Sequence, residues 1–82
     1  MYKNITYFNK YKSVKKYEKD LLNSLIFENL VKTKERKNEI TYVNPDLLIT
    51  IKKTVVIFLI FNYKNYHIIN KINQLCDLNS KG

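Results

Sequence analysis

One apolar block, Leu47–Phe61, dominates the pattern of hydrophobic and polar positions along the chain. Eight of the thirteen residues from Ile49 to Phe61 have β-branched side chains, whose restricted χ1 angles suit a pleated surface. The second half, Val55–Phe61, is apolar at every position, which is typical of a strand covered on both faces or pressed against a partner molecule. The block therefore predicts β-structure, in which Lys52 and Lys53 form either a hairpin turn or a bend within one long strand.

Two stretches with helical periodicity lie on either side of this block. Residues 13–31 place their apolar side chains on one side of a 3.6-residue wheel, and Ser13 is a suitable N-cap. Residues 65–78 carry a narrower apolar stripe. The stripes consist of Val14, Tyr17, Leu21, Leu22, Leu25 and Ile26 in the first segment and of Ile68, Ile69, Ile72, Leu75 and Cys76 in the second. We therefore expect two helices, the first of them packed on the sheet.

The remaining segments are polar or short. Residues 32–39 contain no apolar side chain, which favours a mobile basic loop around Arg36 or a solvated connection. Glu39–Val43 alternates briefly like a strand, and Asn44–Asp46 has the composition of a turn, because proline fixes φ and Asx side chains stabilise bends. Residues 1–12 interleave aromatic and basic side chains, which is typical of an N-terminal arm, although a short edge strand is also possible.

These patterns predict a small α+β protein. We expect a basic and aromatic N-terminal arm at residues 1–12, followed by one domain over residues 13–82. That domain combines an amphipathic helix, a short β-sheet of two to four strands and a C-terminal helix. Because a chain this short buries only about 60% of the surface that its unfolded form exposes, its own core is expected to be marginal.

The charge of the chain points to a polyanionic partner. Basic side chains outnumber acidic ones by 15 to 7, which gives a net charge of +8 and a pI near 9.6. Such an excess on a small domain favours nucleic acid or, less often, an anionic membrane. Fourteen of the fifteen basic residues are lysines, and asparagine, isoleucine and tyrosine are also abundant. An A+T-rich gene produces the same bias without selection for binding.

Candidate RNA-binding residues follow from this charge. Lysines neutralise phosphates as point charges, an arginine forms bidentate phosphate pairs, and aromatic rings stack on unpaired bases. The candidate phosphate contacts are Lys3, Lys10, Lys12, Lys15, Lys16, Lys32, Lys34, Arg36, Lys37, Lys52, Lys53 and Lys64, and the candidate stacking residues are Tyr2, Tyr7, Phe8 and Tyr11. The alternative is that the lysines are merely solvated and that the aromatic residues belong to an ordinary core.

Enzymatic chemistry is not expected. His67 and Cys76 are the only histidine and cysteine, and nine helical residues place two side chains on opposite sides of a helix. The sequence therefore predicts neither a Cys–His dyad nor a cluster of metal ligands. Asp46 and Asp77 are better interpreted as capping or solubilising residues. We expect no catalytic residue, no metal and no cofactor.

Three segments of the chain resemble the small-subunit ribosomal protein family numbered nineteen. Its basic segment K-T-x-S-R-R-S-x-I is similar to residues 32–40, its V-Y-N-G-K turn to residues 60–64 and its opening S-L-K-K to residues 13–16. The basic segment is matched in type by Lys32, Thr33, Arg36, Lys37 and Ile40, whereas Glu35 departs from it. Residues 68–82 are similar to a stretch ending in S-T-S-K-G in the ribosomal protein family numbered eight. Both resemblances imply a ribosomal protein of an A+T-rich organelle, with rRNA backbone contacts at residues 10–19 and 32–37.

The leading hypothesis is a non-enzymatic, structural rRNA-binding component of a mitochondrial or plastid ribosome, acting in translation within the small-subunit ribonucleoprotein. Its expected partners are rRNA and neighbouring ribosomal proteins, with no small-molecule substrate; outside an organelle we would expect it in the cytoplasm. One alternative is an accessory subunit of an organellar membrane complex, with residues 47–61 in or against lipid. That block is shorter than the roughly 20 residues of a helical span and contains two lysines. A phage- or plasmid-encoded inhibitor of a nucleoprotein enzyme is the third hypothesis.

Overall fold

The computed structural model describes residues 3–24, 29–62 and 66–80; for residues 24 and 75–80 it describes the backbone alone. These residues form five strands and two helices. In chain order they are β1 (Lys3–Phe8), α1 (Val14–Ser24), β2 (Val31–Arg36), β3 (Glu39–Val43), β4 (Leu47–Lys52), β5 (Val55–Ile60) and α2 (Tyr66–Ser80). The α+β prediction is confirmed for a small single domain, but the sheet has five strands where we expected two to four.

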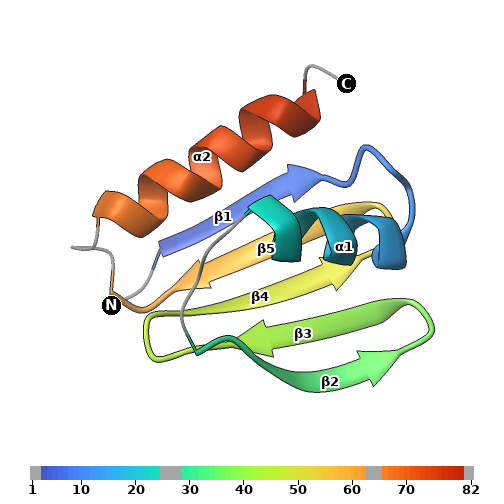
Figure 1. Cartoon of the computed structure of the whole chain (residues 1–82), viewed down its shortest axis with the longest axis horizontal. Coiled ribbons are helices and arrows are strands. Elements are labelled where there is room, and N and C mark those ends of the chain that lie inside the picture. Colours follow the sequence, from blue (N-terminus) through green and yellow to red (C-terminus); the bar gives the residue numbers. More distant parts are fainter. Residues whose placement is uncertain (1–2, 25–28, 63–65, 81–82) are drawn as a thin grey trace.

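The strands form one antiparallel sheet in the order β1-β5-β4-β3-β2 (Figure 1). Strands β2 to β5 follow one another as a meander. Strand β1 pairs with β5 at the far edge, so α1 carries the chain across the sheet from one edge to the other. Helix α1 contacts β3 and β4, and α2 lies along β1.

The core lies on one face of this sheet. Alternate residues of the apolar block are fully buried, and in register Ile49 lies opposite Phe58 and Ile51 opposite Val56. They form one cluster with Tyr17 of α1 and with residues of α2. The residues between them in β4 and β5 are only partly buried. Strands alternate side chains between faces, so the uninterrupted apolar run supplies a core face and a second face that no described element covers.

Both helices confirm the predicted periodicity but differ in length from the prediction. In α1 the backbone N–H of Lys16 donates to Ser13 Oγ at 3.3 Å, as an N-cap should. Val14, Tyr17 and Leu21 are buried in α1, as are Ile68 and Ile72 in α2, but Leu22, which was also predicted on the apolar stripe, is 52% exposed. Helix α1 ends at Ser24 rather than at residue 31, because the chain must enter β2 to pair with β3. The expected stripe members at positions 25 and 26 lie outside the described residues.

Two segments that we expected to be irregular are edge strands. Residues 1–12 contain β1 rather than a separate arm, and residues 32–39 contain most of β2 and its turn rather than a loop. The reason is physical: an edge strand pairs on one side only, so its sequence needs no apolar alternation, and lysines protect its open side. Every residue of β2 is exposed. A hairpin turn separates β4 from β5, as one of the two alternatives predicted, but it consists of Lys53 and Thr54 because Lys52 is the last residue of β4.

Candidate nucleic-acid interface

Basic side chains gather at one end of the sheet. Strands β1, β2 and β4 run in the same direction, so their carboxyl ends and the loops that follow lie together (Figure 1). These loops are residues 9–13, residues 37–38 and residues 53–54. We call this region the basic end; its cations are Lys10, Lys12, Lys15, Lys16, Arg36, Lys37, Lys52 and Lys53. Eight of the twelve candidate phosphate contacts therefore lie in one region.

A shallow depression of about 240 Å³ lies at the centre of the basic end. It is lined by Lys12, Ser13, Val14, Lys15, Lys37, Asn38 and Lys53, which come from the β1–α1 loop with the start of α1, the β2–β3 turn and the β4–β5 turn. Four of the seven residues are lysines. We call it the basic depression. Segments far apart in the sequence thus present their cations to the same space.

The basic depression carries little internal neutralisation. Among the described residues, Lys12, Lys37 and Lys53 have no carboxylate within the 4.0 Å of an ion pair. Lys15 is paired, at 2.6 Å from Glu35. The first turn of α1 contains no acidic residue, and its free N–H groups add partial positive charge. The result is a concentrated positive field that suits an anion.

Asn9 holds two of the converging loops together, and sequence reasoning missed it. Its side-chain amide donates to the backbone carbonyls of Lys52 and Ser13, both at 3.0 Å. Its backbone N–H donates to the carbonyl of Thr54 at 2.8 Å, and its Oδ1 accepts from the N–H of Tyr11 at 3.1 Å. Asn9 is only 3% exposed. The available signal was an Asx residue directly after an alternating segment, a position typical of turns.

The loop after Asn9 has an unusual backbone. Lys12 has φ of 51°, a left-handed conformation that costs a residue with a Cβ about 1–2 kcal/mol. Its N–H donates to the carbonyl of Asn9 at 3.0 Å, which closes a tight turn before α1. This turn places Lys12 on the wall of the basic depression. Strained residues of this kind are often found at functional sites.

A second group of charges neutralises cations beside the depression. The Glu18 cluster consists of Glu18, Lys32, Tyr42, Lys15 and Glu35, and joins α1 to β2 and β3. Glu18 Oε2 accepts hydrogen bonds from Tyr42 Oη at 2.5 Å and from Lys32 Nζ at 2.9 Å. Glu35 Oε2 accepts from Lys15 Nζ at 2.6 Å and Lys32 Nζ at 3.2 Å. These contacts fix the edge strand β2 against α1.

A β-bulge makes the Glu18 cluster possible. The register between β2 and β3 shifts between Lys32 and Lys34, so Lys32 lies opposite Tyr42 and Glu35 opposite Ile40. Without the extra residue, Lys32 and Lys34 would share a face. With it, Lys32 and Glu35 both face α1, whereas Lys34 faces the other way and pairs with Glu39 at 3.2 Å.

The pKa values of the Glu18 cluster follow from these contacts. Burial favours the neutral form of Glu18, but hydrogen bonds from Tyr42 and Lys32 outweigh it and lower the pKa of that carboxyl. Burial, followed by the hydrogen bond to Glu18, raises the pKa of Tyr42. The hydrogen bonds to Glu18 and Glu35 raise the pKa of Lys32, and hydrogen bonds from Lys15 and Lys32 lower the pKa of Glu35. Glu18, Glu35 and Lys32 are therefore charged at neutral pH, whereas the phenol of Tyr42 stays protonated and donates to Glu18.

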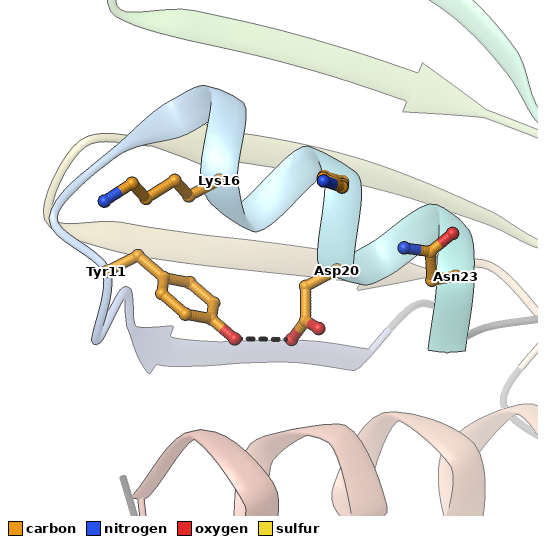
Figure 2. Close-up of a pocket in the computed structure, with 5 residues that line it drawn as sticks. Tyr11, Lys16, Asp20 and Asn23 are labelled. Carbon is orange, nitrogen blue, oxygen red and sulfur yellow. Dashed lines mark hydrogen bonds between the residues drawn. The ribbon is translucent and has the colours of Figure 1, made fainter.

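The candidate stacking residues are placed very differently. Tyr7 packs edge-on against Phe58, with 6.2 Å between ring centres, and donates to Asn73 Oδ1 at 2.9 Å, so it belongs to the core side. Phe8 lies on the opposite face and is 84% exposed. Tyr11 donates to Asp20 Oδ2 at 2.9 Å (Figure 2), and this hydrogen bond, with burial, raises the pKa of its phenol. Only Phe8 presents a free ring among the described candidates.

Tyr11 also lines a second depression, of about 250 Å³, with Lys16, Lys19, Asp20 and Asn23. Figure 2 shows Tyr11 and Asp20 pointing toward one another beneath α1. Because this depression contains a carboxylate, its field is weaker than that of the basic depression. It is the poorer site for a polyanion.

The other candidate residues lie outside the basic end. Lys3 begins β1 at the opposite end of the sheet. Lys32 and Lys34 lie on β2 and are held in ion pairs. Tyr2 and Lys64 fall outside the described residues.

No family model, curated protein or solved structure matches the chain. The resemblance to ribosomal protein families thus stays a prediction. Neither described helix is long and apolar enough to cross a membrane.

Proposed function

We propose that this protein is a non-enzymatic RNA-binding protein whose basic end holds the phosphate backbone. The observation that carries the proposal is the convergence of Lys12, Lys37 and Lys53 from three loops around one depression. Like charges brought together without carboxylate partners repel one another, so a folded chain keeps them together at a cost that a bound polyanion removes. Structural ion pairing explains Lys15 and Lys32, but it does not explain these three lysines.

The basic depression suits phosphate by size as well as by charge. Its volume of about 240 Å³ has room for a phosphate group together with water molecules. A phosphate group therefore enters with part of its hydration shell, and the lysine ammonium groups reach it as mobile point charges. Such contacts position a backbone and carry no base specificity.

Phe8 supplies a contact of a different kind. Phe8 is the last residue of β1 and lies opposite Val55. Val55 directly follows the β4–β5 turn, which contains Lys53. An exposed ring beside phosphate-binding lysines is the arrangement by which proteins stack unpaired bases. We propose that Phe8 stacks on a base exposed next to the bound backbone.

We further propose that the RNA is ribosomal, in a mitochondrial or plastid ribosome. The support is the lysine-rich composition and the resemblance of residues 32–40 to a ribosomal protein segment. Gradient sedimentation of the tagged protein from its native compartment tests this step. Migration with a ribosomal subunit, abolished by ribonuclease, is the expected result. Migration that ribonuclease leaves unchanged would contradict the ribosomal assignment.

The binding site itself is tested with two matched variants. Lys12, Lys37 and Lys53 are changed together to glutamine; the control changes Lys3, Lys19 and Lys71, which lie outside the depression and also lack ion pairs among the described residues. Both variants lose three charges. Counterion release makes each phosphate contact worth roughly a factor of 5–8 at 0.1 M salt, so the loss of three contacts should make the first variant bind a structured RNA about 100- to 500-fold more weakly than the control. Equal losses would show that only net charge matters and would reject the site.

A further inference from the structure

The face of the sheet opposite the helices carries an apolar strip. Its members are Val43 on β3, Leu48 on β4 and Val55, Ile57 and Leu59 on β5, which the register places side by side: Val43 lies opposite Leu48, and Leu48 opposite Leu59. All five are partly exposed, whereas their neighbours on the core face are fully buried. We call these five residues the open strip.

No described element covers the open strip. Helices α1 and α2 both contribute their buried residues to the core cluster on the other face. The strip spans three adjacent strands, which is about 10 Å between the outer strand axes at ~4.8 Å per spacing. An α-helix is about 10–12 Å across with its side chains. The strip is therefore as wide as one helix.

A second copy of this chain is a poor occupant. At ~4.8 Å between strands and ~3.3 Å per residue, a sheet of this size presents roughly 500 Å² on one face. A stable interface needs about 800 Å² from each partner. Each copy also carries a net charge of +8, so two copies repel. Area and charge both disfavour a homodimer through this face.

The margins of the strip show the chemistry that suits it. On the β2 side, Lys34 and Arg36 lie opposite Thr41 and Glu39, on the same face as the strip. Glu39 is the one carboxylate on this face among the described strand residues, and Lys34 and Lys52 already lie 3.2 and 4.0 Å from it. That margin is net positive. The β1 margin, formed by Asn4, Thr6 and Phe8 opposite Leu59, Ile57 and Val55, is uncharged and ends in the exposed ring of Phe8.

We propose that the open strip docks an amphipathic helix of a partner protein, with acidic residues along the flank that faces Lys34 and Arg36. The helix lays its apolar side on Ile57 and its neighbours, in the helix-in-groove manner of recognition. Its acidic flank pairs with the β2 margin, and its uncharged flank lies over Asn4 and Thr6. This surface lies on the face opposite α1 and includes none of the residues that line the basic depression, although Phe8 borders it opposite Val55.

The test uses two designed helical peptides of about 18 residues with leucines at i, i+3, i+4 and i+7. One carries glutamates along one flank, and the other carries lysines there. NMR titration of the full chain should show the glutamate peptide perturbing the amides of β3, β4 and β5, with an affinity about tenfold above that of the lysine peptide, since each rim pair contributes roughly 1.4- to 5-fold. If the glutamate peptide leaves those amides unperturbed, the proposal is wrong.

Two variants separate this docking from other causes. Lys34→Glu with Arg36→Glu, on the exposed edge strand, should reverse the preference in favour of the lysine peptide. Ile57→Thr, which keeps a β-branched side chain, should weaken both peptides and leave RNA affinity unchanged. An unreversed preference would overturn the charge assignment. Sedimentation showing a dimer, or anionic vesicle binding, that Ile57→Thr abolishes would assign the strip to a second copy or to a membrane instead.

Discussion

The side-chain amide of Asn9 donates a 3.0 Å hydrogen bond to the backbone carbonyl of Lys52, across 43 residues of sequence. This bond joins the β1–α1 loop to the β4–β5 turn, the two segments that bring Lys12 and Lys53 to the basic depression. The same amide also satisfies the carbonyl of Ser13. A buried polar side chain thus links two exposed cations, Lys12 and Lys53, that lie far apart in the sequence.

Asn9→Ala should reduce both stability and RNA binding. The substitution leaves the carbonyls of Lys52 and Ser13 without the amide, and a lost hydrogen bond of this kind costs about 1–3 kcal/mol. Urea unfolding measures the free energy of unfolding. Asn4→Ala, on an exposed part of β1, is the control and should change it by less than about 0.5 kcal/mol. If the two substitutions change the free energy of unfolding equally, Asn9 does not hold the two loops in position.

Lys12→Gly should separate stability from binding. Glycine adopts the left-handed conformation of this position without a Cβ clash, so we expect a gain of about 1 kcal/mol in the free energy of unfolding. The same change deletes one phosphate contact, and RNA affinity at 0.1 M salt should fall roughly 5- to 8-fold. Unfolding and RNA titration of the one variant give both values. A variant that is more stable and binds as well as the wild type would exclude Lys12 from the interface.

The Glu18 cluster predicts how stability depends on pH. The folded state lowers the pKa of Glu18, so the unfolded state binds its proton more readily. The contribution of Glu18 to the free energy of unfolding is complete above the ordinary glutamate pKa of about 4.3. It is lost as the pH falls through the lower pKa that Glu18 has in the folded state. Glu18→Gln should lower the free energy of unfolding by about 1–2 kcal/mol at pH 7. It should also reduce the loss of stability between pH 5 and 3, and Glu35 accounts for the loss that remains. Urea unfolding across this range tests it, and an unchanged acid slope would contradict the assignment.

The two faces of the sheet should respond differently to the loss of one phenyl ring. Phe58 is fully buried and contacts Tyr7, so Phe58→Ala should cost about 3–5 kcal/mol, enough to unfold a marginal domain. Phe8 is 84% exposed, so Phe8→Ala should change stability by less than about 0.5 kcal/mol. It should nevertheless weaken the binding of single-stranded RNA. Thermal unfolding followed by circular dichroism separates the two cases, and similar effects would contradict the assigned faces.

Some of this arrangement follows from local sequence, and some does not. The strands of residues 47–61 were predicted because β-branched side chains report their preference locally. The Ser13 N-cap was predicted because a cap needs only its own helix. Strand β2 was missed because all its residues are exposed, so its sequence lacks the apolar alternation by which a strand is recognised. It is a strand because its backbone pairs with β3. The role of Asn9 depends on a turn 43 residues away, and the meeting of Lys12, Lys37 and Lys53 depends on the order of all five strands. Neither feature has a local signal.

The salt dependence of RNA affinity tests the central claim most directly. The three lysines of the basic depression without ion pairs, Lys12, Lys37 and Lys53, should displace counterions and give the wild type a slope of log K against log salt concentration of about −2 to −3. In the Lys12, Lys37 and Lys53 triple variant the slope should be shallower by about 2 to 3, whereas the variant at Lys3, Lys19 and Lys71 should keep the wild-type slope. If the two triple variants lose slope equally, the basic end is not the RNA site, and the positive charge of the chain acts only as a diffuse field.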